Sequence, residues 1–188
     1  SSLFTLHSSP FTLHPSLFLS VTLPPVNRAR GLFLIKFFAL VTVLYVVISL
    51  DPVDRTVIAA FTHGVTLASA GLLHLFGQPV EVIGTIMRDK SFAVDVKNGC
   101  NGIEALILLV AAIVAFGGSW KRRLAGVALG FVVIEGVNLI RIASLFEIGK
   151  HNPAVFEQFH LVIWQSVIIV LSVVFFVIWS GRVAERPA

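Results

Sequence analysis

Charged residues are scarce in this sequence. Asp, Glu, Lys and Arg make up 13% of its 188 residues, whereas hydrophobic residues make up 56% and the mean hydropathy is +0.93. Soluble domains carry about 25% charged residues, so this composition excludes a soluble globular domain. The sequence contains one cysteine, Cys100. A single cysteine excludes an intrachain disulfide framework and a cysteine-rich zinc site. The sequence also lacks a phosphate-binding loop and any cofactor fingerprint, so no cofactor is predicted.

Long apolar stretches dominate the chain from residue 31 onward and predict an all-α integral membrane protein. A transmembrane helix needs about 20 apolar residues, and we expect four such helices, at residues 31–50, 102–118, 124–146 and 160–180. Residues 31–188 are expected to form a single membrane-embedded domain. Residues 1–30 repeat the tetrapeptide Phe-Thr-Leu-His, contain no acidic residue and are interrupted by prolines. We treat them as a leader of uncertain status and assign them no function.

Residues 56–76 are also apolar but carry a polar stripe along one side of a predicted helix. Such a stripe is typical of a helix that lies in the membrane interface, or of one whose stripe faces a cavity. We favour the interfacial interpretation, in which this segment is not a fifth span. The polar residues of the stripe are Thr56, Thr62, His63, Thr66, Ser69 and His74.

Residues 80–97 change character and predict a short β-hairpin-like segment on the outer face. Apolar and polar residues alternate over residues 92–97, the period expected of a strand. Residues 80–87 form a weaker strand pattern, and residues 88–90 (Arg-Asp-Lys) are a plausible turn between the two.

Basic residues lie between the apolar stretches, a pattern that indicates membrane orientation and argues against a nucleic-acid partner. With four spans and both termini in the cytoplasm, seven basic residues lie on the cytoplasmic side with Glu185 as the only acid among them, as the positive-inside rule requires. A fifth span at 56–76 would move some of these bases to the other side. The cytoplasmic bases are Arg28, Arg30, Lys121, Arg122, Arg123, Arg182 and Arg186.

This topology brings three reactive side chains to one depth near the outer membrane boundary. Cys100 precedes the second span, Arg141 lies near the outer end of the third, and His160 opens the fourth. A thiol, a guanidinium and an imidazole are the parts of a cysteine acyl-transfer site. In that interpretation Cys100 is the nucleophile, favoured as a thiolate by a helix N-terminus. Arg141 stabilises negative charge, and His160 is the general base and acid.

Each residue alone has a plainer interpretation. A single cysteine in an apolar protein is often a packing residue, an arginine near a helix end can extend to the headgroups, and a histidine there is commonly a surface residue. The catalytic interpretation depends on the coincidence of the three in depth.

Five further residues are predicted to support this site. Asn98 and Asn101 flank the cysteine within the turn-forming run Asn-Gly-Cys-Asn-Gly. Glu104 shares the helix face of Cys100 and is expected to pair with Arg141. Asn138 lies on one face with Glu135 and Arg141, which predicts a polar seam inside the bundle. Trp164 could pack against His160, but a membrane-interface anchor is the favoured role; His63 and His74 are weak evidence for a metal, and none is predicted.

At these residues the sequence resembles the exosortase/archaeosortase family of membrane-embedded, cysteine-dependent protein-sorting enzymes. The resemblance runs from about residue 70 to 180 and rests on residues 96–104 (Val-Lys-Asn-Gly-Cys-Asn-Gly-Ile-Glu), 138–145 (Asn-Leu-Ile-Arg-Ile-Ala-Ser-Leu) and 159–165 (Phe-His-Leu-Val-Ile-Trp-Gln). The subgroup it is most similar to is exosortase H, from bacteria.

The resemblance implies that Cys100, Arg141 and His160 are the catalytic residues of a multi-pass enzyme in the bacterial inner membrane, with its active site facing the periplasm. It implies substrates that are exported proteins with a C-terminal sorting signal: a short motif such as Ile-Pro-Thr-Leu, a transmembrane helix and a basic tail. Cleavage would proceed through a thioester, and the product would pass to an acceptor.

A second interpretation is a non-catalytic membrane protein, such as a transporter subunit or assembly factor, in which the polar seam lines a solute path. An aspartyl intramembrane peptidase is disfavoured because no predicted span contains an aspartate. A rhomboid-type serine site is disfavoured because the sequence lacks a matching serine motif.

Overall fold

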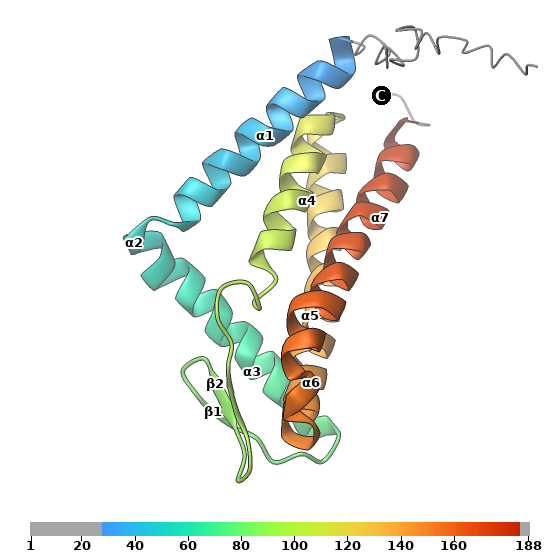
Figure 1. Ribbon diagram of the computed structural model, residues 1–188. Helices are drawn as coiled ribbons and strands as arrows, with labels where there is room; N and C mark the ends of the chain where they lie inside the picture. Colours follow the sequence, from blue (N-terminus) through green and yellow to red (C-terminus); the bar gives the residue numbers. More distant parts are fainter. Residues whose placement is uncertain (1–27, 185–188) are drawn as a thin grey trace, which may run out of the picture.

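The computed structural model describes residues 28–184, so the predicted leader lies almost wholly outside the described residues. These residues form helices and one small sheet (Figure 1). In chain order the elements are α1 (Arg28–Ile48), α2 (Asp51–Val53), the π-helical turn η2 (Asp54–Ile58), α3 (Ala59–Leu75), β1 (Glu81–Ile83), β2 (Ile86–Arg88), β3 (Ala93–Asp95), α4 (Ile103–Phe116), α5 (Trp120–His151), α6 (Pro153–Gln158), the π-helical turn η3 (Phe159–Trp164) and α7 (Gln165–Ala184).

Four helices are long and apolar enough to cross a membrane by length and composition, which confirms the predicted fold class. They are Arg28–Ile48, Asp51–Leu75, Trp120–His151 and Pro153–Val183. This set differs from the four predicted spans in one member, because α4 has only 14 residues, a length of about 21 Å at 1.5 Å per residue. Both ends of α4 are set by glycines with positive φ, Gly102 at +83° and Gly117 at +101°.

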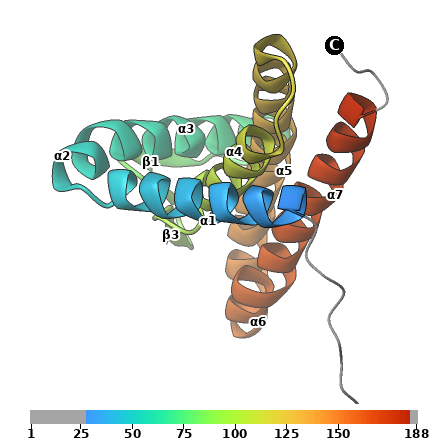
Figure 2. The same ribbon diagram turned by 90° about the horizontal axis from the view of Figure 1, so that it is seen from above.

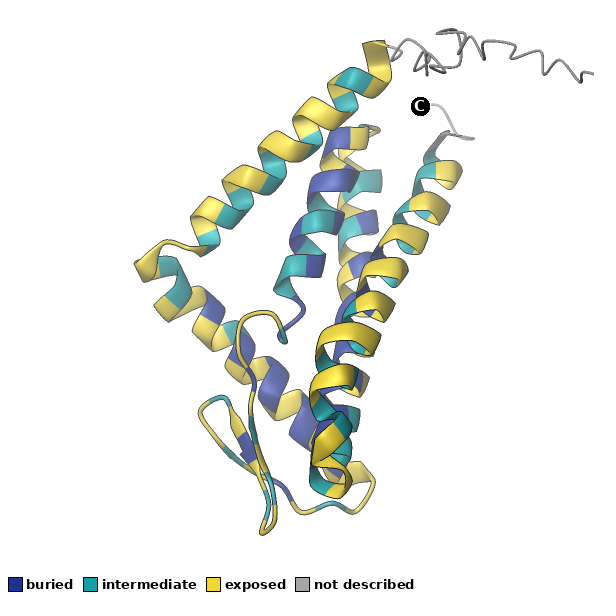
Figure 3. Ribbon diagram, in the orientation of Figure 1, coloured by how far each residue is buried: buried dark blue, intermediate teal, exposed yellow. Residues whose placement is uncertain are grey.

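Helices α4, α5 and α7 pack side by side, and α1 leans against α4 (Figures 1 and 2). One core cluster joins the three packed helices through Leu109 and Ile113 of α4, Ile134 of α5 and Ile168 of α7. The close approach needs glycine, because a Cβ at Gly130 of α5 would collide with the Leu109 side chain. The outer surfaces of α1 and α7 are exposed and apolar (Figure 3), as expected of helices that face lipid.

The polar stripe of the segment around α3 is turned toward the protein in its middle. Thr62, Thr66 and Ser69 are buried, and each hydroxyl donates to the carbonyl four residues earlier. The opposite side is open, and Leu75 on it is 84% exposed. The interfacial interpretation expected this stripe in water; packed side chains cover it instead. Whether Asp51–Leu75 lies in the interface or crosses the membrane stays a prediction, since its length and composition allow both.

The predicted hairpin is a three-stranded antiparallel sheet with the order β1-β2-β3. The alternation over residues 92–97 is confirmed, because Val94 and Val96 point inward while Asp95 and Lys97 are exposed. An additional turn at Gly84, where φ is +63°, divides the weaker strand pattern into β1 and β2. Met87 at the centre of β2 is fully buried.

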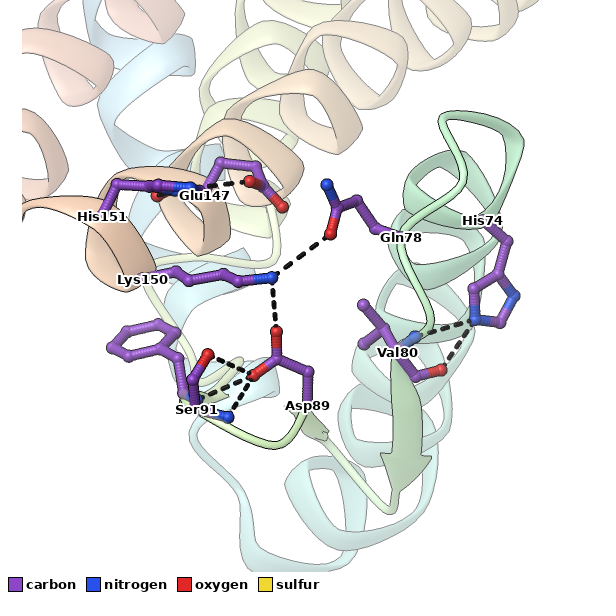
Figure 4. Close-up of polar contacts among 9 residues, drawn as sticks. His74, Gln78, Val80, Asp89, Ser91, Glu147, Lys150 and His151 are labelled. Carbon is purple, nitrogen blue, oxygen red and sulfur yellow. Dashed lines mark hydrogen bonds and ion pairs between the residues drawn. The ribbon is translucent and has the colours of Figure 1, made fainter.

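Two histidines of α3 bind the sheet rather than each other. Nδ1 of His63 lies 2.6 Å from the carbonyl oxygen of Gly84. Nε2 of His74 lies 2.7 Å from the carbonyl oxygen of Val80 (Figure 4). Within residues 28–184, no group of three His, Cys, Asp or Glu side chains could hold a metal ion.

The far end of α5 fixes the turn between β2 and β3. Nζ of Lys150 lies 2.7 Å from the Asp89 carboxylate and donates to Gln78 Oε1 at 3.2 Å (Figure 4). Asp89 also accepts the backbone N–H of Ser91 at 2.7 Å. The hydrogen bond from Lys150 holds the pKa of the Asp89 carboxyl well below its usual range. The turn is thereby anchored, and the chain leaving β3 runs directly into the loop that carries Cys100.

Candidate active site

The thiol of Cys100 and the imidazole of His160 are in direct contact. Sγ of Cys100 lies 2.6 Å from Nε2 of His160. Cys100 belongs to the loop between β3 and α4, whereas His160 is the second residue of the π-helical turn η3. π-Helical turns occur mostly as single turns and frequently at functional sites. The predicted proximity of a cysteine and a histidine, 60 residues apart in sequence, is therefore present in the fold.

The loop around Cys100 is held in one shape by its neighbours. Gly99 and Gly102 have positive φ values of +91° and +83°. Residues other than glycine rarely adopt this backbone conformation. The backbone N–H of Cys100 donates to the carbonyl of Lys97 at 2.9 Å. These constraints fix the direction in which the thiol points.

Both asparagines of the loop bind other elements. Asn101 is fully buried, and its Nδ2 donates to Thr62 Oγ1 at 2.9 Å while its Oδ1 accepts the N–H of Ile103 at 3.2 Å. Asn98 Nδ2 donates to Asp54 Oδ1 at 3.0 Å, and Asp54 belongs to the other π-helical turn, η2. The loop is thus tied to α3, to the start of α4 and to η2. Asp54 had no sequence signal that linked it to the site.

Arg141 is buried beneath the loop. Only 2% of it is exposed, which excludes the interpretation that it extends to the headgroups. Its Nη2 donates to the carbonyl oxygen of Gly99 at 3.4 Å, one residue before the nucleophile candidate. The guanidinium therefore holds the loop and places a positive charge beside the thiol.

The polar seam of α5 is confirmed as an interior feature. Glu135 is 7% exposed and Asn138 is fully buried, and Nδ2 of Asn138 lies 3.4 Å from Glu135 Oε2. The seam supports the loop from below, because a Cβ at Gly102 would collide with the carboxylate of Glu135. Glu135 Oε1 and Asn138 Oδ1 have no hydrogen-bond partner among the described residues.

The expected ion pair between Glu104 and Arg141 is wrong. Within residues 28–184 no ion pair joins the two side chains. Glu104 instead lines a cavity between α1, α4 and α7 together with Phe37 and Tyr45. The reason is geometric: Arg141 approaches the loop from α5, whereas Glu104 points to the side of α4 that α1 covers.

Burial raises the pKa of the Cys100 thiol above its usual value. The positive charge of Arg141 acts in the opposite direction, and the negative charge of Glu104 adds to the increase. Cys100 lies three residues before the first residue of α4, so the helix-terminus argument for a thiolate is outweighed. The imidazole of His160, whose Nε2 lies 2.6 Å from Sγ, is placed to accept the thiol proton.

The aromatic ring beside His160 is that of Phe156, with ring centroids 5.8 Å apart. Phe156 lies one helical turn earlier and also contacts Phe92, with centroids 6.1 Å apart. Among the described ring contacts none joins Trp164 to His160, so the packing interpretation of Trp164 is not supported; its role as an interface anchor stays a prediction. The spacing of four residues between Phe156 and His160 was an available but unused sequence signal.

The comparisons with known proteins show the family of the chain. No curated protein and no solved structure gave a significant match to the chain. A family model described as transmembrane exosortase, of the EpsH type, matches residues 8–180, which is most of the chain and includes every residue of the site. Members of this family are generally membrane transpeptidases. The chain belongs to the transmembrane exosortase family.

Proposed function

We propose that this protein is a cysteine transpeptidase or protease that cleaves the C-terminal sorting signal of exported proteins and transfers the product to an acceptor. Family membership supports a membrane exosortase. The observation that carries the proposal is the 2.6 Å contact between Cys100 Sγ and His160 Nε2, with Arg141 held beside it on the Gly99 carbonyl. The proposed substrates carry a motif of the Ile-Pro-Thr-Leu type, a membrane helix and a basic tail.

The first half of the proposed reaction forms a thioester. As Sγ of Cys100 attacks the scissile carbonyl carbon, Nε2 of His160 takes the thiol proton, which overcomes the raised pKa of the buried thiol. The carbonyl oxygen becomes an oxyanion, and the positive charge of Arg141 stabilises it. When the tetrahedral intermediate collapses, the C–N bond breaks and His160 gives its proton to the leaving amine.

The second half regenerates the enzyme. An acceptor amine or a water molecule attacks the thioester carbon, and His160 removes a proton from it. Collapse of the second intermediate breaks the C–S bond, and the proton returns from His160 to the sulfur. Atoms and charge balance over the two halves without a cofactor.

The topology supports an active site on the periplasmic side. The start of α1, the α4–α5 connection and the end of α7 lie at one end of the molecule (Figure 1). The basic residues of these segments are Arg28, Arg30, Lys121, Arg122, Arg123 and Arg182. Such bases remain in the cytoplasm under the positive-inside rule. Arg141 lies 21 residues into α5, about 30 Å along the helix, which is about the thickness of the hydrocarbon core. The site is therefore proposed to lie at the outer boundary of the inner membrane.

A co-expression experiment tests the proposal. A reporter with the sorting signal at its C-terminus is produced in a bacterium together with the wild-type chain, Cys100→Ala, His160→Ala or Arg141→Ala, and its mass is measured. His151→Ala is the matched control, because that histidine is exposed and lies one turn beyond Glu147 on α5. We expect a truncated or acceptor-linked reporter only with the wild type and the control.

Two outcomes would contradict the proposal. One is processing by Cys100→Ala. The other is an unprocessed reporter with all variants correctly inserted and Cys100 inert toward membrane-impermeant thiol reagents, which would favour the non-catalytic interpretation.

A further inference from the structure

A groove runs along the membrane-facing side of the bundle between α1, α4 and α7. Its outer part is a cavity of about 410 Å³, and its inner part is a second cavity of about 670 Å³. The two share Phe33 and Leu34 of α1 and Phe176 of α7. On α4 the lining extends from Glu104 to Phe116, a distance of about 18 Å, or more than half of the hydrocarbon thickness.

Polar side chains line both ends of this groove. Arg30 and Lys36 of α1 lie at the inner end, and three polar side chains lie at the end nearest the candidate active site. They are Tyr45 near the end of α1, Glu104 in the first turn of α4 and Gln165 at the start of α7. Ser172 also lines the groove, but its hydroxyl donates to the carbonyl of Ile168 at 2.8 Å within its own helix. The rest of the lining of the outer cavity is apolar.

Two of these polar residues follow the reactive groups closely in the chain. Glu104 follows Cys100 by four residues, and Gln165 follows His160 by five. Glu104 forms no ion pair with another described residue. The groove is therefore apolar in its middle, and its outer end carries hydrogen-bonding groups on the side of the candidate active site.

A membrane helix that is cut near its outer end matches the apolar middle and the hydrogen-bonding outer end of the groove. Its intact part presents apolar side chains, whereas the peptide to be cleaved must be unwound, which frees backbone N–H and C=O groups at membrane depth. Such groups need protein partners, because lipid offers none and each unsatisfied group costs several kcal/mol. An acyl chain, by contrast, has no hydrogen-bonding group to offer.

We propose that the groove between α1, α4 and α7 binds the membrane helix of the sorting-signal substrate, and that Tyr45, Glu104 and Gln165 hydrogen-bond the unwound segment that leads to Cys100. This inference rests on the proposed function, since it needs a substrate with a membrane helix. The substrate helix would add a fourth wall to α1, α4 and α7 and would replace lipid in the groove.

Cysteine cross-linking tests whether the substrate helix binds in the groove. The chain has one cysteine, so few side reactions compete. In a Cys100→Ala background the chain has no other cysteine, so a single new one reports one position. Leu34→Cys and Val173→Cys are placed in the groove; Ile35→Cys and Val174→Cys are their matched controls, adjacent in sequence but exposed on other faces, at 69% and 46%. With a reporter that has one cysteine in its membrane helix, we expect disulfide-linked product at the groove positions and not at the controls.

A bulky substitution tests the consequence for processing. Val173→Trp fills the groove, whereas Val174→Trp points into lipid, and both positions are exposed enough to accept a large side chain. We expect Val173→Trp to lower processing of the membrane-anchored reporter at least about tenfold, equivalent to about 1.4 kcal/mol of lost binding. Val174→Trp should process normally, and labelling of Cys100 by a small thiol reagent should be unchanged in both variants.

The outcomes separate the two proposals. If wild type processes the reporter but cross-links form equally at groove and control positions, or the two tryptophan variants behave alike, the groove is not the binding site and the proposed function stands. If wild type does not process the reporter, the proposed function fails.

Discussion

Replacing Gly102 by alanine should disrupt the candidate active site from beneath the Cys100 loop. A Cβ at this position would lie 2.4 Å from Glu135 Oε1 and 3.0 Å from Asn138 Nδ2. The backbone φ of +83° adds strain for any residue with a side chain, about 1–2 kcal/mol. Overpacking against a buried neighbour adds about 1–3 kcal/mol. We therefore expect Gly102→Ala to lower the free energy of unfolding by about 2–5 kcal/mol, the sum of these two effects.

Two other glycines separate these effects. Gly99 has a similar φ of +91°, but an added Cβ would meet nothing within 4 Å, so Gly99→Ala should cost only the backbone strain of about 1–2 kcal/mol. Gly136 lies within α5, also with nothing within 4 Å, so Gly136→Ala should stabilise by about 0.5–1 kcal/mol. Unfolding in detergent, followed for all three variants together with the rate of Cys100 labelling, gives the comparison.

The steric part of the effect can be isolated by a double substitution. Glu135→Ala removes the carboxylate that the new Cβ would meet, so Gly102→Ala should cost less in that background, with a coupling energy of about 1–3 kcal/mol. Equal losses for Gly99→Ala and Gly102→Ala, or no coupling between Gly102→Ala and Glu135→Ala, would refute the claim that the seam supports the loop.

Three further results are expected. Labelling of Cys100 by a thiol reagent should accelerate as pH rises toward the raised pKa of the thiol. Arg141→Gln should move this pH profile to higher pH, because the cation that lowers the pKa of the thiol is lost. An unmoved profile would show that the two groups do not interact. Asp89→Asn should destabilise the protein near neutral pH, because the ion pair with Lys150 lowers the pKa of the Asp89 carboxyl. That stabilisation is present above the unfolded-state pKa of about 4 and is lost as pH falls toward the lower folded-state pKa, so unfolding curves of wild type and variant should converge in acid; a constant difference would contradict the linkage. Asn101→Ala should cost about 1–3 kcal/mol, because it leaves buried partners unsatisfied, and a smaller loss in detergent unfolding would mean that the loop rearranges.

The composition and the periodicity of apolar residues were sufficient to predict a membrane-embedded protein and most of its helices and strands. They did not predict the lengths of these elements. Residues 102–118 are apolar throughout, and only the positive φ values of Gly102 and Gly117 limit α4 to 14 residues. Conversely, residues 51–75 form a long apolar helix whose polar stripe is satisfied within the protein. Hydropathy reports how apolar a segment is and not which of its faces another helix covers.

The sequence was sufficient to predict the depth of the site residues in the membrane, but not the direction in which each side chain points. A helix advances by a constant rise per residue, so position in sequence gave the common depth of Cys100, Arg141 and His160. The direction of a side chain around its helix depends on how neighbouring helices pack, and this is why Glu104 was assigned to Arg141 although it faces the groove. The catalytic roles of the three residues stay predictions until the variants are assayed.

The π-helical turn η3 interrupts one long helix from Pro153 to Val183. It changes the direction in which side chains point around the helix axis before and after the turn. Each π turn accommodates one more residue than an α turn, so residues before and after it are offset by about 100° relative to an uninterrupted α-helix. The apolar surface of α7 can therefore meet α4 and lipid while His160 points to Cys100. Because of this one inserted residue, the helix face that packs in the membrane and the face that carries His160 are not tied to one α-helical repeat. The packing of α7 and the direction of the His160 imidazole can therefore change separately.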